Sequence, residues 1–148
     1  LDTSLAAGPM QTSNVRSARL RWTGQDLVFR GGADGGPEVV VDGGSKAGAS
    51  PMQLLLLSVA GCMAIDVRVI LDKSRVPLDS MEVEVVGERT ETEPQRFFAI
   101  QLIYRLSGPL EEHEAKLQRA IDLSRDKYCS VLHTLDPGID FDISIERS

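Results

Sequence analysis

The feature that most constrains the fold is the segment 50–73, SPMQLLLLSVAGCMAIDVRVILDK. Ser50 can cap a helix, Pro51 suits its first position, and Gln53 has the spacing of a capping box with Ser50. Residues 54–65 are apolar or small on every face, too few for a membrane span but too many for a helix on a monomer surface. The segment therefore predicts a long central helix that is buried on all sides, most simply between two subunits.

The composition is that of one ordinary globular domain. The chain has 148 residues, of which 42% are hydrophobic, enough to build one core. Its net charge of -6 repels phosphate backbones and anionic lipid headgroups, so we expect no nucleic-acid or membrane partner. Two cysteines do not form a secreted-type disulfide framework, which favours the cytoplasm and reduced thiols. Residues 1–17 carry no secretory signal and are expected to be disordered or vector-derived, which leaves a single domain at 18–148.

The N-terminal part of that domain has the pattern of short strands. Alternating runs at 18–22 and 26–30 predict a hairpin, and the β-branched run at 37–42 predicts a third strand. Glycine is concentrated in residues 31–48, which predicts turns and a mobile surface loop. This loop lacks the strand–loop–helix pattern of a phosphate-binding site, so we expect no nucleotide cofactor.

The C-terminal part alternates strands and helices. Two alternating runs within 81–106 predict a second hairpin, and residues 109–128 predict an amphipathic helix. Residues 129–138 predict a further helical turn that ends at a proline and a glycine, and 139–146 a closing strand. The apolar stripe of the amphipathic helix is expected to comprise Leu117, Ala120, Ile121, Ser124 and Tyr128. The resulting order, βββ-α-ββ-α-β, is that of an α+β domain.

The first cysteine, Cys62, lies within the apolar helix, where a thiol usually acts as a small hydrophobic side chain. Asp66 follows at i+4, so a carboxylate emerges on the same face. A buried charge needs a partner, and an approaching cation would also favour the thiolate of Cys62. Asp66 is therefore either part of a salt bridge that fixes helix packing or a catalytic group.

The second cysteine, Cys129, begins a short helical segment beside Lys127. A helix N-terminus and an ammonium group both lower a thiol pKa, which predicts a reactive position; the alternative is a structural thiol under a loop. His133 would share the face of Cys129 and suggests a Cys-His nucleophile or a metal site. A closed zinc site needs four ligands, and only Cys62 and the distant His113 remain, so we expect no metal, a partly exposed polar His133 and a solvated His113.

Four segments together resemble a known family. Residues 50–67, VEVVGER (83–89), PQRFFAIQLIYR (94–105) and AIDLSRDKYCSV (120–131) resemble, in order and spacing, the OsmC/Ohr family of thiol-dependent peroxide-detoxifying proteins, most closely its OsmC-like branch. The resemblance extends from about residue 19 to residue 145. It implies an α+β, OsmC-like fold with two hairpin-built sheets around a long central helix, in an intertwined homodimer with its active sites at the subunit interface.

The resemblance also implies a role for each cysteine. Cys62 would be the peroxidatic thiol that becomes a sulfenic acid, and Cys129 the resolving thiol that condenses with it to a disulfide. A small-molecule or protein dithiol would then reduce the pair. An apolar pocket around Cys62 would select organic hydroperoxides over hydrogen peroxide. We expect its lining to include Leu55, Ser58, Val59 and Ile65.

The chain departs from the family pattern at one position. Hydroperoxide reductases of this family carry a glutamate directly after the proline, where this chain has Met52 followed by Gln53. Asp66 is a candidate to replace that acid. For the family's active-site arginine, Arg89 in the GER stretch is the favoured candidate. Three other arginines stay open as alternatives: Arg19, Arg21 and Arg30.

Two functions are therefore compatible with the sequence. The first is a Cys-based peroxidase, which the presence of both thiols in family context favours. The second is a non-catalytic homodimer that binds a small apolar ligand in the interface pocket, with the cysteines as packing residues. The missing glutamate after Pro51 favours this second function.

Overall fold

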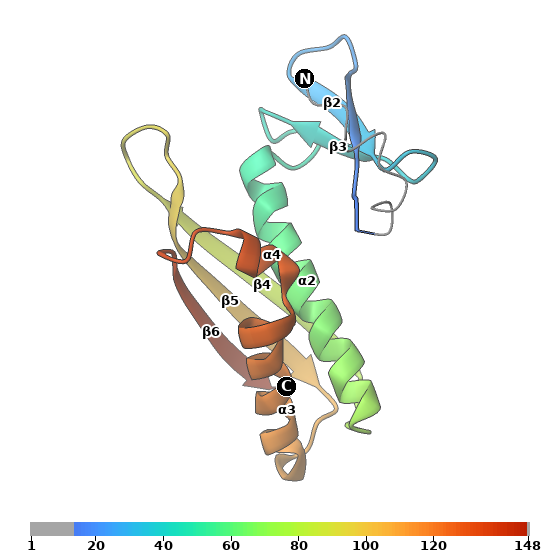
Figure 1. The fold of residues 1–148 in the computed structure, drawn as a ribbon, viewed down its shortest axis with the longest axis vertical. Helices are drawn as coiled ribbons and strands as arrows, with labels where there is room; N and C mark the ends of the chain where they lie inside the picture. Colours follow the sequence, from blue (N-terminus) through green and yellow to red (C-terminus); the bar gives the residue numbers. More distant parts are fainter. Residues whose placement is uncertain (1–13, 148) are drawn as a thin grey trace. The chain divides into compact units, whose positions relative to one another are not determined.

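The structure, a computed structural model, describes residues 14–147, so most of the 1–17 segment lies outside the described residues. The chain runs through strands β1 (Arg19–Trp22), β2 (Val28–Gly32) and β3 (Val39–Asp42), helix α2 (Pro51–Lys73), and strands β4 (Ser80–Arg89) and β5 (Phe97–Ser107). It continues through a 3-10 turn, η2 (Glu111–His113), helix α3 (Glu114–Leu123), a π-helical turn, η3 (Ser124–Tyr128), helix α4 (Ser130–Thr134) and strand β6 (Asp140–Arg147) (Figure 1). The predicted order of elements is confirmed.

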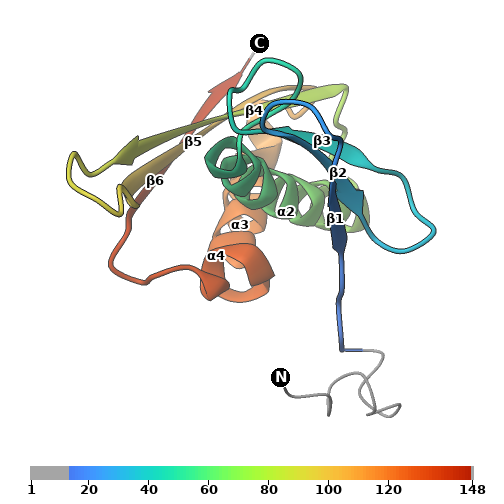
Figure 2. The same ribbon diagram turned by 90° about the horizontal axis from the view of Figure 1, so that it is seen from above.

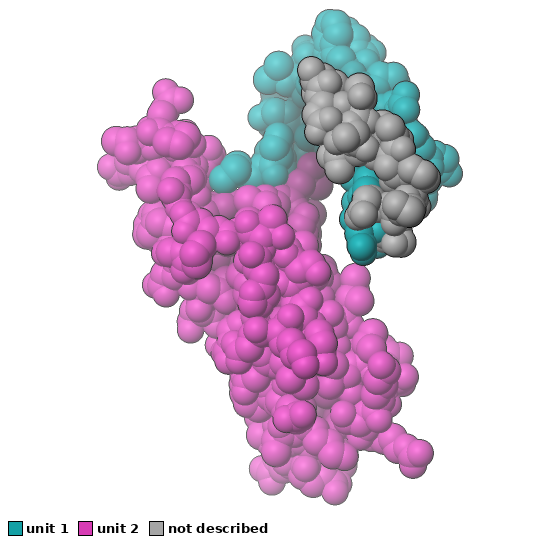
Figure 3. Space-filling view, viewed as in Figure 1, with its two compact units in different colours: residues 1–53 teal, residues 54–148 magenta. Residues whose placement is uncertain are grey.

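Two compact units make up the chain, Leu1–Gln53 and Leu54–Ser148 (Figure 3). The first contains an antiparallel sheet with the strand order β1-β2-β3, as the alternating runs predicted. The hairpin closes where the Thr23 amide donates to the Val28 carbonyl at 3.0 Å. Gly24 lies in this turn at φ +88°, a conformation that glycine adopts without a steric penalty. The prediction of one domain from residue 18 onward stays a prediction.

The loop after β3 is anchored by one carboxylate. Asp42 is 5% exposed, and its carboxylate accepts backbone hydrogen bonds from Gly44, Lys46 and Ala47 at 2.8, 3.1 and 2.8 Å. These bonds, that of Ala47 first, lower the pKa of Asp42. Residues 43–47 are thus an exposed turn, as predicted, in which one side chain satisfies three backbone donors; the mobility of this loop stays a prediction.

Helix α2 begins as the sequence predicted. The Gln53 amide donates to Ser50 Oγ at 3.3 Å, and the Ser50 amide donates to Gln53 Oε1 at 2.9 Å, which completes the capping box. By length and composition alone, α2 could cross a membrane. However, one stripe of the helix is packed inside the protein and comprises Val59, Ala60, Met63, Val67 and Leu71. Helix α2 is thus a core helix, although three large apolar residues outside this stripe, Leu57, Ile65 and Val69, are exposed.

The second unit is a three-stranded sheet with helices on one face. The strand order is β4-β5-β6, with β4 and β5 antiparallel and β5 and β6 parallel. Helices α2, α3 and α4 all lie on the same side of this sheet (Figures 1 and 2). The central strand β5 sends alternate side chains toward them, and these are fully or almost fully buried: Ile100, Leu102, Tyr104 and Leu106. The core therefore lies between β5 and the helices.

Asp42 offers a test of the loop. We expect Asp42→Asn to increase the hydrogen-exchange rates of the Gly44, Lys46 and Ala47 amides, because a neutral amide is a weaker acceptor. Because folding lowers this pKa, the stabilisation by Asp42 is present above the unfolded pKa and is lost as pH falls through the folded pKa. In urea unfolding, the free energy of unfolding of the variant should therefore fall less than that of the wild type between pH 5 and 2, about the range in which carboxylates titrate. Asp34→Asn, at an exposed ion pair with Arg19, is the control. Unchanged exchange in Asp42→Asn would contradict the assignment.

Candidate active site

Cys62 lies in the fourth turn of α2 at the edge of the buried stripe. It is half-buried, whereas the neighbouring Val59 and Met63 are completely buried. Asp66, one turn further on, is also half-buried, as the i+4 spacing predicted. Helix α2 therefore presents a reachable thiol and a carboxylate on adjacent turns.

The π-helical turn η3 determines which side chain meets α2. The Cys129 amide donates to the Ser124 carbonyl at 2.8 Å, an i to i+5 bond that puts one extra residue into the turn. The predicted stripe assumed ordinary α-helical spacing and placed Tyr128 inside. That prediction is wrong for this residue, because Tyr128 is 48% exposed and Cys129 is completely buried. Ser124, also in the stripe, is completely buried as predicted.

The two thiols meet in the structure. Both cysteines are free, and Cys62 lies close enough to Cys129 to act on the pKa of its thiol. They come from elements far apart in the sequence, α2 and the junction of η3 with α4. The fold therefore brings together the only two thiols of the chain, on the face of α2 that also carries Asp66.

The pKa of Cys129 is raised to about 11, chiefly because the thiol is buried. The Leu132 amide at the start of α4 donates to Cys129 Sγ at 3.3 Å and acts in the opposite direction, while Cys62 and Asp66 raise the pKa further. The ammonium of Lys127 lies 5.3 Å from the centre of the Tyr128 ring. The expected lowering of this pKa is therefore wrong, since burial outweighs the helix N-terminus.

A second buried polar contact lies beside the thiols. The Ser124 hydroxyl donates to Asp66 Oδ2 at 2.9 Å. Among the described residues, this hydroxyl takes the place of the cation that the sequence analysis expected beside Asp66. Tyr104 on β5 also belongs here, because it is completely buried and the charges of Cys129 and Asp66 act on it. No polar role for Ser124 or Tyr104 was expected from the sequence, although each residue carries a polar atom at an inward position of its element.

A hollow of about 440 Å³ opens next to Asp66. Its lining consists of Asp66, Val69, Ile70, Lys73, Ser74, Leu123 and Tyr128. The residues predicted to line the approach to Cys62 do not belong to it: Val59 is completely buried, and Ile65 is 65% exposed. The hollow therefore lies along the turns of α2 that follow Cys62, and its walls are mainly apolar with a carboxylate and an ammonium group.

The candidate arginines do not join the thiols within their own unit. Arg89 is exposed, and its Nε donates to the Gln95 carbonyl at 2.6 Å in the β4–β5 hairpin. In the first unit, Arg19 pairs with Asp34 and Arg21 with Glu38, while Arg30 is exposed on β2. A catalytic role for any of these arginines stays a prediction.

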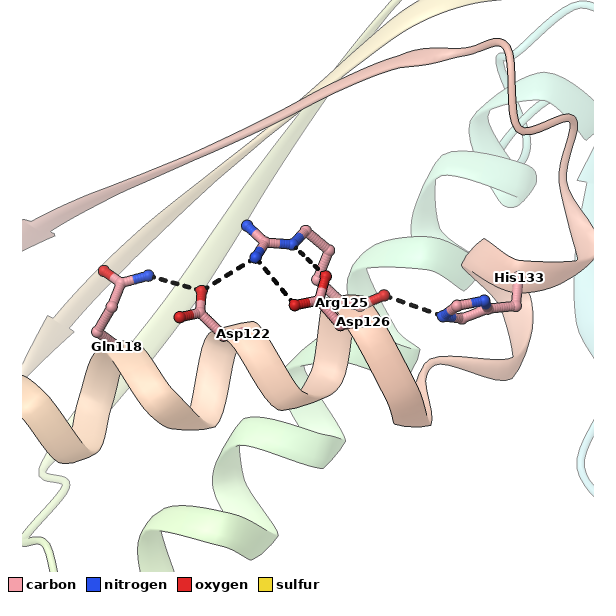
Figure 4. Close-up of polar contacts among 5 residues, drawn as sticks. All are labelled: Gln118, Asp122, Arg125, Asp126 and His133. Atoms are coloured by element: carbon pink, nitrogen blue, oxygen red, sulfur yellow. Dashed lines mark hydrogen bonds and ion pairs between the residues drawn. The ribbon is translucent and has the colours of Figure 1, made fainter.

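A polar network on the outer side of α3 holds the segment around Cys129 (Figure 4). Arg125 bonds Asp122 at 3.2 Å and Asp126 at 2.8 Å, and Gln118 donates to the same Asp122 oxygen at 2.9 Å. His133 Nε2 donates to the Arg125 carbonyl at 3.0 Å, which ties α4 back to η3. His133 is thus exposed and structural, and residues 14–147 contain no cluster of side chains suited to a metal ion.

The chain resembles known proteins over most of its length. The family model described as OsmC-like protein matches residues 43–144. Protein YhfA of Escherichia coli (strain K12) is 38% identical over 130 residues, which cover 87% of this chain and 96% of YhfA. The chain belongs to the OsmC-like family. The family predicted from the sequence motifs is therefore confirmed.

Solved structures share the OsmC-like fold. A hypothetical protein from Aquifex aeolicus VF5 has a TM-score of 0.78 at 30% identity, over 90% of this chain and 96% of that one. A Legionella pneumophila protein described as an organic hydroperoxide resistance protein, OsmC, has a TM-score of 0.62 at 17% identity, over 89% of this chain and 96% of its own. The predicted α+β, OsmC-like fold class is confirmed.

The two residues after Pro51 do not supply a carboxylate, and one of them caps helix α2. Met52 is half-buried and has no acid to offer. The side-chain oxygen of Gln53 accepts hydrogen bonds from Ser45 Oγ at 2.6 Å and from the Ser50 amide at 2.9 Å. Gln53 is therefore committed to capping α2, which leaves Asp66 as the carboxylate on the thiols' face of the helix.

We expect His133→Ala to expose Cys129 without unfolding the protein. In a Cys62→Ser background, alkylation of Cys129 should become about fivefold faster, because loss of one net hydrogen bond costs about 1 kcal/mol of local stability. Iodoacetamide labelling followed by mass spectrometry measures this rate. His113→Ala is the matched control, since His113 bonds only the Leu110 amide at η2. Equal rates in both variants would refute a role for His133 in holding α4.

Proposed function

We propose that this protein is a Cys-based peroxidase that reduces organic hydroperoxides through a Cys62 sulfenic acid resolved by Cys129. The observation that carries the proposal is the meeting of the two free thiols in the core of an OsmC-like fold. The name of the Legionella pneumophila protein, an organic hydroperoxide resistance protein, is consistent with it.

The different environments of the two thiols assign their roles. Cys62 is half-buried, so a peroxide can reach it, whereas Cys129 is completely buried. A thiol with a pKa of about 11 is almost entirely protonated at neutral pH and is a poor first nucleophile. Cys62 therefore attacks the peroxide, and Cys129 reacts with the product of that attack.

The reaction has three balanced steps. The Cys62 thiolate attacks the terminal peroxide oxygen of ROOH; the O–O bond breaks, and the sulfenic acid and, after protonation of the alkoxide, an alcohol form. The Cys129 thiol then attacks the sulfenic sulfur, and its proton leaves with the hydroxyl group as water. A small-molecule or protein dithiol finally reduces the disulfide through a mixed disulfide. Two electrons thus pass from the dithiol to the peroxide.

The apolar surroundings of the site support an organic substrate. The walls of the hollow beside Asp66 include Val69, Ile70 and Leu123. Each buried CH2 of a ligand contributes about 0.8 kcal/mol, so a few methylenes favour an alkyl hydroperoxide over hydrogen peroxide by about one or two factors of ten.

The proposed enzyme is an intertwined homodimer in the cytoplasm. Three large apolar residues of α2 stay exposed in the single chain: Leu57 at 56%, Ile65 at 65% and Val69 at 45%. The first unit exposes a second apolar set, Leu20, Trp22, Leu27 and Val39. Exposed apolar sets of this size favour association, and a second copy of the chain supplies matching surfaces. Reduced thiols without a disulfide framework fit the cytoplasm.

Peroxide turnover tests the enzyme directly. With dithiothreitol or dihydrolipoamide, the protein should consume cumene or tert-butyl hydroperoxide faster than hydrogen peroxide. Cys62→Ser should abolish consumption, whereas Cys129→Ser should consume a single equivalent and stop at the oxidised Cys62. Mass spectrometry of the oxidised wild-type protein should show the loss of two hydrogens and one peptide pair that joins the two cysteines.

The control in this assay is Ser130→Ala, next to Cys129, which should retain wild-type turnover because the Ser130 side chain is exposed. Independent overoxidation of both cysteines, or no consumption of any peroxide, would reject the enzyme. In that case, the site would be a binding pocket for a small apolar ligand.

Light scattering tests the homodimer. The wild-type protein should have twice the mass of one chain at micromolar concentration, and Ile65→Glu on the uncovered face of α2 should reduce it to monomer or cause aggregation, since a buried charge without a partner is unfavourable. Leu110→Glu is the control, because Leu110 is similarly exposed but lies outside α2. A folded wild-type monomer would contradict the dimer.

A further inference from the structure

Tyr104 carries a hydroxyl group that is not explained by packing. The residue is completely buried on β5, and its hydroxyl is the one side-chain polar atom among the described residues that is both buried and without a hydrogen-bond partner. A buried unpaired hydroxyl destabilises a protein. The inward neighbours on the same strand, Leu102 and Leu106, show that an apolar side chain fits this row. The hydroxyl therefore points to a partner that exists in another state of the site.

The charges that act on the Tyr104 phenol identify that partner. Cys129 and Asp66 lie close enough for their charges to act on the phenol, and together with burial, the largest cause, they raise the pKa of Tyr104. Asp66 already accepts a bond from the Ser124 hydroxyl at 2.9 Å. The phenol thus keeps its proton when its neighbours are negative, and it remains available as a hydrogen-bond donor.

The sulfur of Cys129 needs such a donor during thiol–disulfide exchange. Its present donor is the Leu132 amide at 3.3 Å, and burial opposes its negative charge. When a dithiol attacks the more accessible sulfur of Cys62, Cys129 leaves as a thiolate, and a thiolate of high pKa is a poor leaving group. A second hydrogen-bond donor to this sulfur would stabilise the charge as it forms.

We propose that the Tyr104 hydroxyl donates a hydrogen bond to the Cys129 thiolate that forms when the Cys62–Cys129 disulfide is opened, and that Tyr104 is thereby a catalytic residue of the reduction step. The proposal rests on the proposed pairing of the two thiols. In this step the S–S bond breaks, a mixed disulfide forms between Cys62 and the dithiol, and the electron pair stays on Cys129. The second thiol of the reductant then releases Cys62, and two protons return to the cysteines.

The experiment compares disulfide reduction in wild-type protein and Tyr104→Phe. Diamide, a thiol oxidant, forms the disulfide without any peroxide, so the test stands even if the protein reduces no peroxide. Reduction by dithiothreitol, quenched with an alkylating agent and followed by mass spectrometry, should be about tenfold or more slower in the variant. The equilibrium with glutathione at neutral pH should not change, because both cysteines end protonated. A merely structural role would instead shift that equilibrium.

Tyr128→Phe is the matched control, because Tyr128 is the second of the two tyrosines and is half exposed. Its reduction rate should equal that of the wild type. If Tyr104→Phe does not fold, 3-fluorotyrosine can be incorporated in the Tyr128→Phe background, where Tyr104 is the remaining tyrosine. The fluorinated ring stays in place and its hydroxyl is a stronger hydrogen-bond donor, so the reduction should be faster. An unchanged reduction rate in Tyr104→Phe, or in the fluorinated protein, overturns the proposal.

Discussion

The hydrogen bond from the Cys129 amide to the Ser124 carbonyl is the interaction upon which the site depends. It closes a turn with one residue more than an α-helical turn, and this extra residue moves Tyr128 outward and Cys129 inward. The same turn keeps Ser124 inside, where it bonds Asp66 on α2. Without this single backbone bond, neither the two thiols nor the carboxylate and its hydroxyl partner would face each other.

Burial then gives the two thiols different chemistry. The helix N-terminus at α4 donates to the Cys129 sulfur, yet the loss of hydration is larger and keeps this thiol protonated. Cys62, at the edge of the buried stripe of α2, stays reachable. A site with one accessible and one protected thiol is suited to two sequential reactions, and the network around Arg125 and His133 holds the protected thiol in place (Figure 4).

The polar side chains near the start of α2 show how the chain departs from the expected pattern without loss of structure. Gln53 caps the helix and accepts a bond from Ser45, and Asp42 organises the loop that precedes it. These contacts give a structural role to Gln53, which lies next to the position of the family's glutamate. The carboxylate beside the thiols comes instead from Asp66, within the helix itself.

The sequence by itself determined the order of the elements, the start of α2 and the family, because capping residues, alternation and motif spacing are local signals. It also placed Asp66 on the face of Cys62, since both lie on one regular helix. Only the tertiary structure decided that β6 lies parallel to β5, that Cys129 replaces Tyr128 in the core, and that the Tyr104 hydroxyl is buried without a hydrogen-bond partner among the described residues. Strand pairing, a single π-helical turn and the burial of a sulfur atom depend on contacts between distant segments, which local patterns do not encode.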